Sequence, residues 1–262
     1  MNLHLKDKVI IVTGGAGLPD SIGETIVRSV VNEGGIPVII DKNNTRGDSF
    51  AGRLKQGGSD CLFVQADLTE PYDCKKTVEK TLSTYGRING LVNNLGVNDG
   101  VGLDKNCDDF INSLKLNLVH FFAMTKYSLD ALKKSKGSIV NIASKVAVTG
   151  QGGTSGYAAS KGGVLALTRE WAVDLREFGI RVNALVISES WTPAYSEWIN
   201  KLDEPESKLI SITRKIPLEQ RMTKPEEIAD TVLFLLSDRS SHTTGQHVFV
   251  DGGYVHLDRA IS

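Results

Sequence analysis

The fold class follows from one segment, Val9-Ile10-Ile11-Val12-Thr13-Gly14-Gly15-Ala16-Gly17-Leu18-Pro19-Asp20-Ser21-Ile22-Gly23. Its apolar, β-branched start predicts a buried strand, its glycine-rich middle predicts a turn, and a helical pattern begins at Ile22. Glycines at such a turn let the backbone approach a pyrophosphate, which the dipole at the helix N-terminus stabilises. A glycine-rich turn alone is weak evidence, so the rest of the chain must agree with it.

Short apolar runs alternate with longer helical patterns along the whole chain. Strands are expected at Val9–Thr13, Pro37–Ile40, Cys61–Gln65, Gly90–Val92, Ser138–Ile142, Ile180–Val186 and His247–Val250. Helices are expected at about Ile22–Glu33, Thr45–Lys55, Pro71–Tyr85, Cys107–Lys134, Ser155–Phe178 and Pro225–Leu236. Continuous Val and Ile runs are typical of parallel strands that helices cover on both faces. The pattern predicts a single doubly wound, Rossmann-type α/β domain over residues 1–262, with a parallel seven-stranded sheet and helices on both faces.

The composition restricts the class of protein. With 262 residues and 40% hydrophobic content, the chain can bury one sizeable core. Thirty basic and thirty-one acidic residues give a net charge of −1 without basic blocks, which gives no support to nucleic-acid or membrane binding. No apolar run approaches ~18 residues and no signal-peptide core is present, so a cytoplasmic protein is expected. Three widely spaced cysteines and five scattered histidines predict reduced thiols and no metal site.

The segment Tyr157-Ala158-Ala159-Ser160-Lys161 carries the strongest chemical signal. Four residues make about one helical turn, so the phenol and the ammonium project from the same helix face. A phenol has a pKa of ~10, and a nearby ammonium favours the phenolate. Ser144 ends the apolar run before this helix, so the three side chains predict a proton-transfer site for alcohol–carbonyl chemistry. Alternatively, a Tyr/Lys pair at this spacing covers helix surface.

Acidic and amide side chains follow three further strands. Asp41 ends the second strand, where a carboxylate can accept both hydroxyls of an adenosine ribose and repel a 2′-phosphate, which favours NAD over NADP. Lys42 and Arg46 lie close by and would weaken that preference. Asp67 can contact an adenine amino group, and Asn93-Asn94-Leu95-Gly96 can form a wall beside the ribose. Each could instead be a turn former without a ligand.

Two regions have open interpretations. The segment at about 188–217 departs from the alternation and contains Trp191, Tyr195 and Trp198. Because it follows the carboxyl end of a strand, it is either a substrate lid or a pair of surface helices that pack their own aromatic side chains. The helix expected at Ser155–Phe178 is apolar on more than one side, which indicates either a subunit interface or a well-buried helix of a monomer.

Taken together, these elements resemble the short-chain dehydrogenase/reductase family. The matching positions are the glycine turn, Asp67, Asn93-Asn94-Leu95-Gly96, Asn117, Ser144, Tyr157, Lys161, Arg181-Val182-Asn183-Ala184 and Val250-Asp251-Gly252-Gly253. The resemblance implies a catalytic tetrad of Asn117, Ser144, Tyr157 and Lys161, with Asn117 bending its helix and holding a water. It also implies a homo-oligomer, most often a tetramer, and a nicotinamide cofactor. The expected cofactor contacts are Gly14, Gly17, Ser21, Ile22, Gly23, Asp41, Asp67, Leu68, Asn94 and Gly96, together with Tyr157 and Lys161.

A narrower resemblance is to the bacterial L-fucose dehydrogenase branch of that family. It rests on Asn98-Asp99-Gly100-Val101-Gly102-Leu103-Asp104, Thr149-Gly150-Gln151-Gly152, Arg169-Glu170-Trp171-Ala172-Val173, His242-Thr243-Thr244-Gly245 and the tail Asp251–Ala260. The branch implies NAD(P)-dependent oxidation of C1 of L-fucose or a related aldose to the lactone. The polar loops of the expected pocket agree with a sugar, and the expected substrate residues are Asn98, Asp99, Gln151 and Glu189. Alternatives are a reductase of 3-oxoacyl or other carbonyl substrates and, in a different class, a non-catalytic NAD-binding protein.

The chain departs from the family pattern in three places. Its glycine turn is two residues longer, with an insertion near Leu18-Pro19-Asp20, as in enoyl reductases, although those space the tyrosine and lysine more widely. Ile187-Ser188 replaces the Pro-Gly that usually follows the sixth strand. Asp41 stands where some fucose dehydrogenases have a basic residue, which bears on cofactor choice.

Overall fold

The computed structural model describes residues 2–257. Within them, one parallel sheet of seven strands runs in the order β3-β2-β1-β4-β5-β6-β7. The sheet confirms the predicted doubly wound α/β fold. Met1 and residues 258–262, which include the end of the tail motif Asp251–Ala260, lie outside the described part. The strands are β1 Val9–Thr13, β2 Ile36–Asp41, β3 Leu62–Gln65, β4 Gly90–Asn93, β5 Ser138–Ser144, β6 Arg181–Ile187 and β7 His247–Val250.

The strand order reverses beside β1, whose two neighbours in the sheet are β2 and β4. Such a switch point opens a crevice at the carboxyl ends of the strands, where doubly wound folds bind ligands. Asp41, Asn93 and Ser144 are each the last residue of their strand. The residues predicted to carry function therefore lie along one edge of the sheet.

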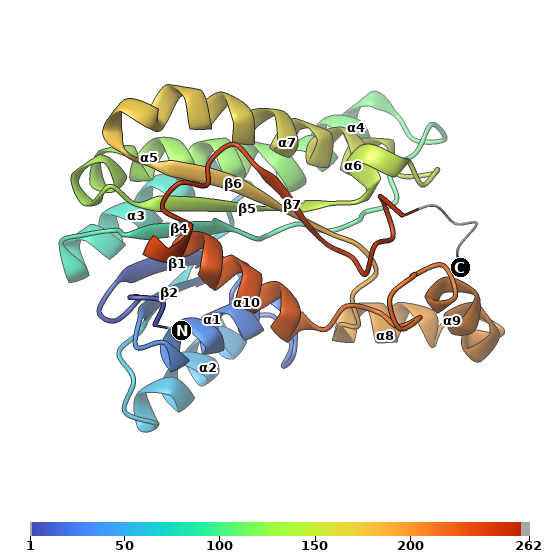
Figure 1. Cartoon of the computed structure of the whole chain (residues 1–262), viewed down its shortest axis with the longest axis horizontal. Helices are drawn as coiled ribbons and strands as arrows, with labels where there is room; N and C mark the ends of the chain where they lie inside the picture. Colours follow the sequence, from blue (N-terminus) through green and yellow to red (C-terminus); the bar gives the residue numbers. More distant parts are fainter. Residues whose placement is uncertain (1, 258–262) are drawn as a thin grey trace.

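Helices cover both faces of the sheet (Figure 1). The alternation of side chains along a strand explains why, because Val9 and Ile11 enter one core while Ile10 and Val12 enter the other. Apolar residues of α3, α5 and α7 complete the first core, and those of α1, α2 and α10 complete the second. The helices of these layers are α1 Ile22–Asn32, α2 Asn44–Gln56, α3 Pro71–Tyr85, α5 His120–Ser135, α7 Ser155–Leu175 and α10 Pro225–Leu236.

The helix predicted at Cys107–Lys134 is not continuous. It divides into α4 Cys107–Leu114, a π-helical turn Lys115–Val119 and α5, and Asn117 lies in the π turn. A π turn holds one residue more than an α turn, so the apolar pattern continues through it and the sequence gives no break. The irregular turn at Asn117 agrees with the expectation that this residue bends its helix.

The segment 188–217 contains two short helices, α8 Pro193–Ile199 and α9 Pro205–Thr213, which stand apart from both helix layers (Figure 1). The one-turn helix α6 Val146–Thr149 follows β5 directly.

No helix among the described residues combines the length and apolar character needed to cross a membrane. Nor do three His, Cys, Asp or Glu side chains of residues 2–257 gather in a way that could hold a metal ion.

Candidate active site

The Ser144 hydroxyl lies close enough to the Tyr157 phenol to hydrogen-bond its phenolate, an interaction that lowers the pKa of the phenol. Ser144 ends β5 and is 8% exposed, and Tyr157 lies in the first turn of α7. The strand and the helix are joined only by α6 and a glycine-containing loop, so the short connection places the helix start against the strand end. The geometry predicted from the sequence for these two residues is therefore present.

Lys161 is buried one helical turn after Tyr157. Its Nζ donates a hydrogen bond of 2.7 Å to the carbonyl oxygen of Ile142 and lies 5.6 Å from the centroid of the Tyr157 ring. It also lies 5.0 Å from the centroid of the Phe121 ring. Burial lowers the pKa of the Lys161 ammonium to about 7, because the charged form loses its hydration.

The expectation that Lys161 lowers the pKa of the phenol is wrong for the protein alone. Burial raises the pKa of Tyr157, the hydrogen bond from Ser144 opposes this, and the negative charge of Asp99 adds to the rise. Burial also lowers the pKa of Lys161, so its side chain carries a positive charge less readily. Desolvation therefore outweighs the attraction that the four-residue spacing suggests.

Asn117 lies near the same lysine, on the other side of Gly96. Its Oδ1 accepts a hydrogen bond of 2.7 Å from the backbone N–H of Val97, while its Nδ2 is buried and has no hydrogen-bond partner in the described part of the chain. Gly96 separates the two side chains, because a Cβ there would lie 3.0 Å from Lys161 Nζ and 3.3 Å from Asn117 Oδ1. The predicted tetrad is thus a contiguous group, and Gly96 leaves room for it.

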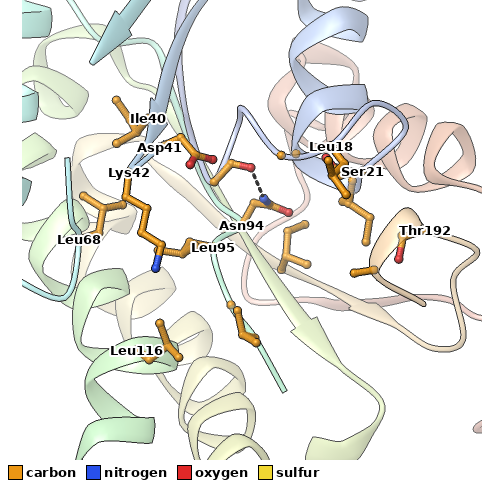
Figure 2. Close-up of a pocket in the computed structure, with 18 of the residues that line it drawn as sticks. Leu18, Ser21, Ile40, Asp41, Lys42, Leu68, Asn94, Leu95, Leu116 and Thr192 are labelled. Carbon is orange, nitrogen blue, oxygen red and sulfur yellow. Dashed lines mark hydrogen bonds between the residues drawn. The ribbon is translucent and has the colours of Figure 1, made fainter. Parts of the chain in front are cut away.

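A cleft of about 540 Å³ opens beside this group at the carboxyl edge of the sheet. Figure 2 shows Asp41 and Lys42 at one end, Leu18, Ser21 and Thr192 at the other, and Asn94 between them. All the cofactor contacts expected from the sequence line this cleft: Gly14, Gly17, Ser21, Ile22, Gly23, Asp41, Asp67, Leu68, Asn94, Gly96, Tyr157 and Lys161.

The glycine turn forms the floor of the cleft. Gly14 has φ +64°, which other residues rarely adopt, and a Cβ at Gly23 would lie 2.0 Å from the Gly14 carbonyl oxygen. Ser21 occupies the N-cap position of α1 without a capping bond from its side chain, and its buried Oγ has no hydrogen-bond partner among residues 2–257. A free hydroxyl and free backbone N–H groups at a helix N-terminus fit the pyrophosphate of a dinucleotide.

The two-residue extension of this turn is held by charged side chains. The backbone N–H of Asp20 donates to Glu24 Oε2 at 3.1 Å, and Arg28 donates to Asp20 Oδ1 at 2.9 Å. Asp20 itself has φ +64°. The extension is therefore an ordered part of the cleft wall, and Leu18 from it contributes to the lining.

Asp41 is oriented by the backbone on both sides. Its Oδ2 accepts from Ala16 N–H at 3.2 Å and its Oδ1 from Asn43 N–H at 3.0 Å. An ionised carboxylate accepts about four hydrogen bonds, so Asp41 keeps capacity for hydroxyl groups in the cleft. Lys42 and Arg46 line the cleft beside it, which agrees with the expectation that they lie close by.

The four expected substrate residues do not lie together, unlike the expected cofactor contacts. Asn98, Asp99 and Gln151 are all exposed, and the negative charge of Asp99 is close enough to Tyr157 to raise the pKa of the phenol. Glu189 forms an ion pair with Lys145 and accepts a hydrogen bond of 2.8 Å from the Tyr195 hydroxyl. None of the four lines the cleft itself.

Thr192, Pro193 and Ala194 close one side of the cleft. They lie in the segment 188–217 that was expected to be either a lid or a pair of surface helices, but none of the three was predicted as a site residue. Thr192 caps α8, because its Oγ1 accepts from Tyr195 N–H at 3.2 Å, and Pro193 is the first helical residue. A Thr-Pro pair five residues after the end of β6 is a helix-start signal that could have indicated this position.

Comparisons with known proteins cover nearly the whole chain. A family model described as enoyl-(acyl carrier protein) reductase matches residues 15–255. L-fucose dehydrogenase of Mus musculus is 34% identical over 248 residues, which are 94% of this chain and 88% of that protein. The 3-oxoacyl-(acyl-carrier-protein) reductase FabG of Thermotoga maritima is 34% identical over 255 residues, 97% of this chain and 100% of that protein. The crystal structure of Cj0485 dehydrogenase has a TM-score of 0.93 at 42% identity, covering 99% of this chain and 98% of the other.

Proposed function

Because the chain belongs to the short-chain dehydrogenase/reductase family, whose members act on CH–OH groups with NAD(P), we propose that it oxidises a sugar hydroxyl. The proposed reaction is oxidation of C1 of L-fucose or a related aldose to the lactone. The observation that carries the proposal is the proximity of the Ser144 hydroxyl to the Tyr157 phenol beside a cleft that fits a dinucleotide. The similarity to L-fucose dehydrogenases supports the choice of a sugar.

In the proposed mechanism, Tyr157 removes the proton from the substrate hydroxyl as a general base. Ser144 hydrogen-bonds the same oxygen and fixes its distance and angle to the phenol. When bound, the nicotinamide supplies the hydride acceptor. Lys161 would hold the phenolate and would donate to the nicotinamide ribose when the cofactor is bound, and Asn117 would hold a water that connects Lys161 to solvent. The unpartnered Nδ2 of Asn117 and the pKa of about 7 at Lys161 support a proton path on this side of the site.

NAD is the proposed cofactor. Asp41 at the cleft end would accept the hydroxyls of the adenosine ribose and repel a 2′-phosphate. Lys42 and Arg46 beside it make use of NADP possible. The segment 188–217 is the proposed substrate lid, a role supported by Thr192, Pro193 and Ala194 at the cleft wall.

The rival function within the family is reduction of 3-oxoacyl or other carbonyl substrates, which the similarity to FabG favours. The enoyl reductase named by the family model is disfavoured by the four-residue spacing of Tyr157 and Lys161. Steady-state assays would compare NAD with L-fucose, D-arabinose and L-galactose against NADPH with a 3-oxoacyl thioester. Faster turnover of the thioester than of every aldose would reject the proposal, and NAD binding without turnover of either would indicate a non-catalytic protein.

A homo-oligomer, with a tetramer as the first expectation, is proposed from the surface of two helices. Val119, Phe122 and Val173 expose apolar side chains around α5 and α7, with exposed fractions of 39%, 51% and 58%. Apolar side chains at this density favour burial against a second subunit. Light scattering coupled to size-exclusion chromatography would measure the mass, and a monomeric mass at micromolar concentration would reject the proposal.

A further inference from the structure

Four side chains from four different elements meet beside the end of β5. Lys145 Nζ forms an ion pair with Glu189 Oε1, and the Tyr195 hydroxyl donates to Glu189 Oε2 at 2.8 Å. The same ammonium lies 4.2 Å from the centroid of the Tyr254 ring. The Lys145–Glu189 pair therefore links the segments that follow β5, β6 and β7 with helix α8.

The pair lies on the substrate side of the site. Lys145 directly follows Ser144, and its backbone N–H donates to the carbonyl oxygen of Ile187 at 2.8 Å. Ile187 lines the cleft. Thr192, Pro193 and Ala194 line it too, and these three residues lie between Glu189 and Tyr195 in the sequence. The Lys145 backbone thus joins Ser144 to Ile187 at the edge of the cofactor cleft, and the Lys145–Glu189 pair lies beside that edge without lining the cleft itself.

The backbone around the pair is fixed from two sides. Thr223 N–H donates to the Glu189 carbonyl oxygen at 3.0 Å, and Trp191 N–H donates to the Thr223 carbonyl oxygen at 3.0 Å. Asp251 accepts from Gly253 N–H at 2.8 Å and from Val255 N–H at 3.0 Å, which shapes the turn that carries Tyr254. The charged groups are therefore presented by a rigid frame.

The charged groups of Lys145 and Glu189 are mostly buried, but each keeps a small exposed fraction that a ligand could contact. The side chains of Lys145 and Glu189 are 11% and 17% exposed. Their mutual attraction is thus little screened, and a ligand in contact with them would feel the net charge of the pair. An ammonium has three donors and a carboxylate about four acceptor positions, so both retain capacity for further hydrogen bonds.

We propose that the Lys145–Glu189 pair is a specificity-determining site that binds hydroxyl groups of a neutral, polyhydroxylated substrate. Glu189 cancels the charge of Lys145, so the site offers donors and acceptors without attracting an anion. A substrate that carries a carboxylate or phosphate would compete with Glu189 for the same ammonium and would be rejected. This inference rests on the proposed function as a sugar dehydrogenase and adds the charge class of its substrate.

The test compares L-galactose with L-galacturonate, which differ only at C6, as substrates with NAD. In Glu189→Gln the ammonium is left uncompensated, so the ratio of kcat/KM for the uronate to that for the neutral sugar should rise at least tenfold. In the double variant Lys145→Met/Glu189→Gln both charges are gone, and the ratio should return to near that of the wild type. Glu79→Gln, which removes an exposed ion pair with Lys75 on α3, outside the site, is the matched control and should leave the ratio unchanged.

An unchanged ratio in Glu189→Gln, or an equal loss for both substrates with intact NADH binding, would overturn the inference and leave the pair a structural link. If Glu189→Gln does not melt cooperatively, the variant Lys145→Met is used instead. It leaves the carboxylate of Glu189 uncompensated, so the ratio of kcat/KM for the uronate to that for the neutral sugar should fall tenfold. An unchanged ratio would reject the inference. A wild type that turns over no aldose would instead reject the proposed function. The same variants would then be assayed with a neutral and a carboxylate-bearing ketone, which decides the inference independently.

Discussion

The ammonium of Lys161 donates a 2.7 Å hydrogen bond to the carbonyl oxygen of Ile142, two residues before Ser144 on the same strand. This bond joins the buried side of α7 to β5 and so fixes the helix turn that carries Tyr157 against the strand end that carries Ser144. The lysine therefore has a structural contact in addition to its proposed role toward the phenolate.

Replacement of Tyr157 by Phe should lower kcat by roughly 10² to 10⁴, the usual contribution of a general base. The dissociation constant for NADH, measured by fluorescence titration, should change little because the ring remains. Tyr72→Phe is the control, since Tyr72 is 74% exposed on α3. A Tyr157→Phe variant that kept a tenth or more of the wild-type kcat would show that another group removes the proton.

Gly96→Ala should impair turnover without unfolding the protein. The new Cβ would lie 3.0 Å from Lys161 Nζ, and the end of a lysine side chain can shift while the backbone stays in place. A small misplacement of a positioning group typically costs roughly ten- to a hundredfold in rate. The melting temperature should stay close to that of the wild type. Gly52→Ala is the matched control, because a Cβ there meets no atom within 4 Å. Equal kcat values for the two variants would contradict the argument.

Lys161→Met should stabilise the cofactor-free protein most at low pH. Burial lowers the pKa of this lysine from 10.5 to about 7, so between these values the unfolded chain binds more protons than the folded one. The cost of burying the cation is therefore full below about pH 7 and is relieved as the pH rises toward 10.5. Thermal melts at about pH 6 and about pH 10 should show a larger advantage of the variant at the lower pH. A pH-independent difference would mean that Lys161 titrates normally.

Asp41→Ala should shift cofactor preference toward NADP. The substitution removes the charge that would repel a 2′-phosphate and leaves Lys42 and Arg46 at the same end of the cleft. The ratio of kcat/KM for NADP to that for NAD should rise at least tenfold, because the variant lacks the repulsion between the Asp41 carboxylate and the 2′-phosphate of NADP. The double variant Asp41→Ala/Arg46→Ala should lose part of the gain. An unchanged ratio would show that Asp41 only supports the glycine turn.

Much of the fold and of the cleft could be predicted because both are encoded locally. The strands predicted from runs of Val and Ile lie within a few residues of their predicted bounds. The ends of these strands bring Asp41, Asn94 and Ser144 to one edge of the sheet. The alternation of strands and helices predicts that edge without knowledge of side-chain contacts. The glycine turn and the Tyr157–Lys161 spacing then indicate where the cofactor and the substrate oxygen would lie.

Other features could not be predicted, because they depend on contacts between distant segments or on burial. The partner of Glu189 is Lys145, 44 residues away, and no local pattern joins them. The sign of the pKa shift at Tyr157 was wrong because spacing reports a neighbouring charge but not the loss of hydration. The break near Asn117 was missed because a single extra residue in a turn leaves the apolar pattern almost unaltered.

That extra residue has a consequence for how this part of the chain tolerates change. One extra residue in a regular α-helix would rotate everything after it by about 100° around the axis, and the wide π turn between α4 and α5 absorbs that rotation. Deleting any single position from 115 to 119 would let the two helices merge into one regular cylinder. The inward stripe of α5, with Phe121 and Met124, could still face the sheet, but Asn117 would lose its hold on Val97. Chain length at this bend is accordingly a stricter requirement than the identity of the exposed side chains around it.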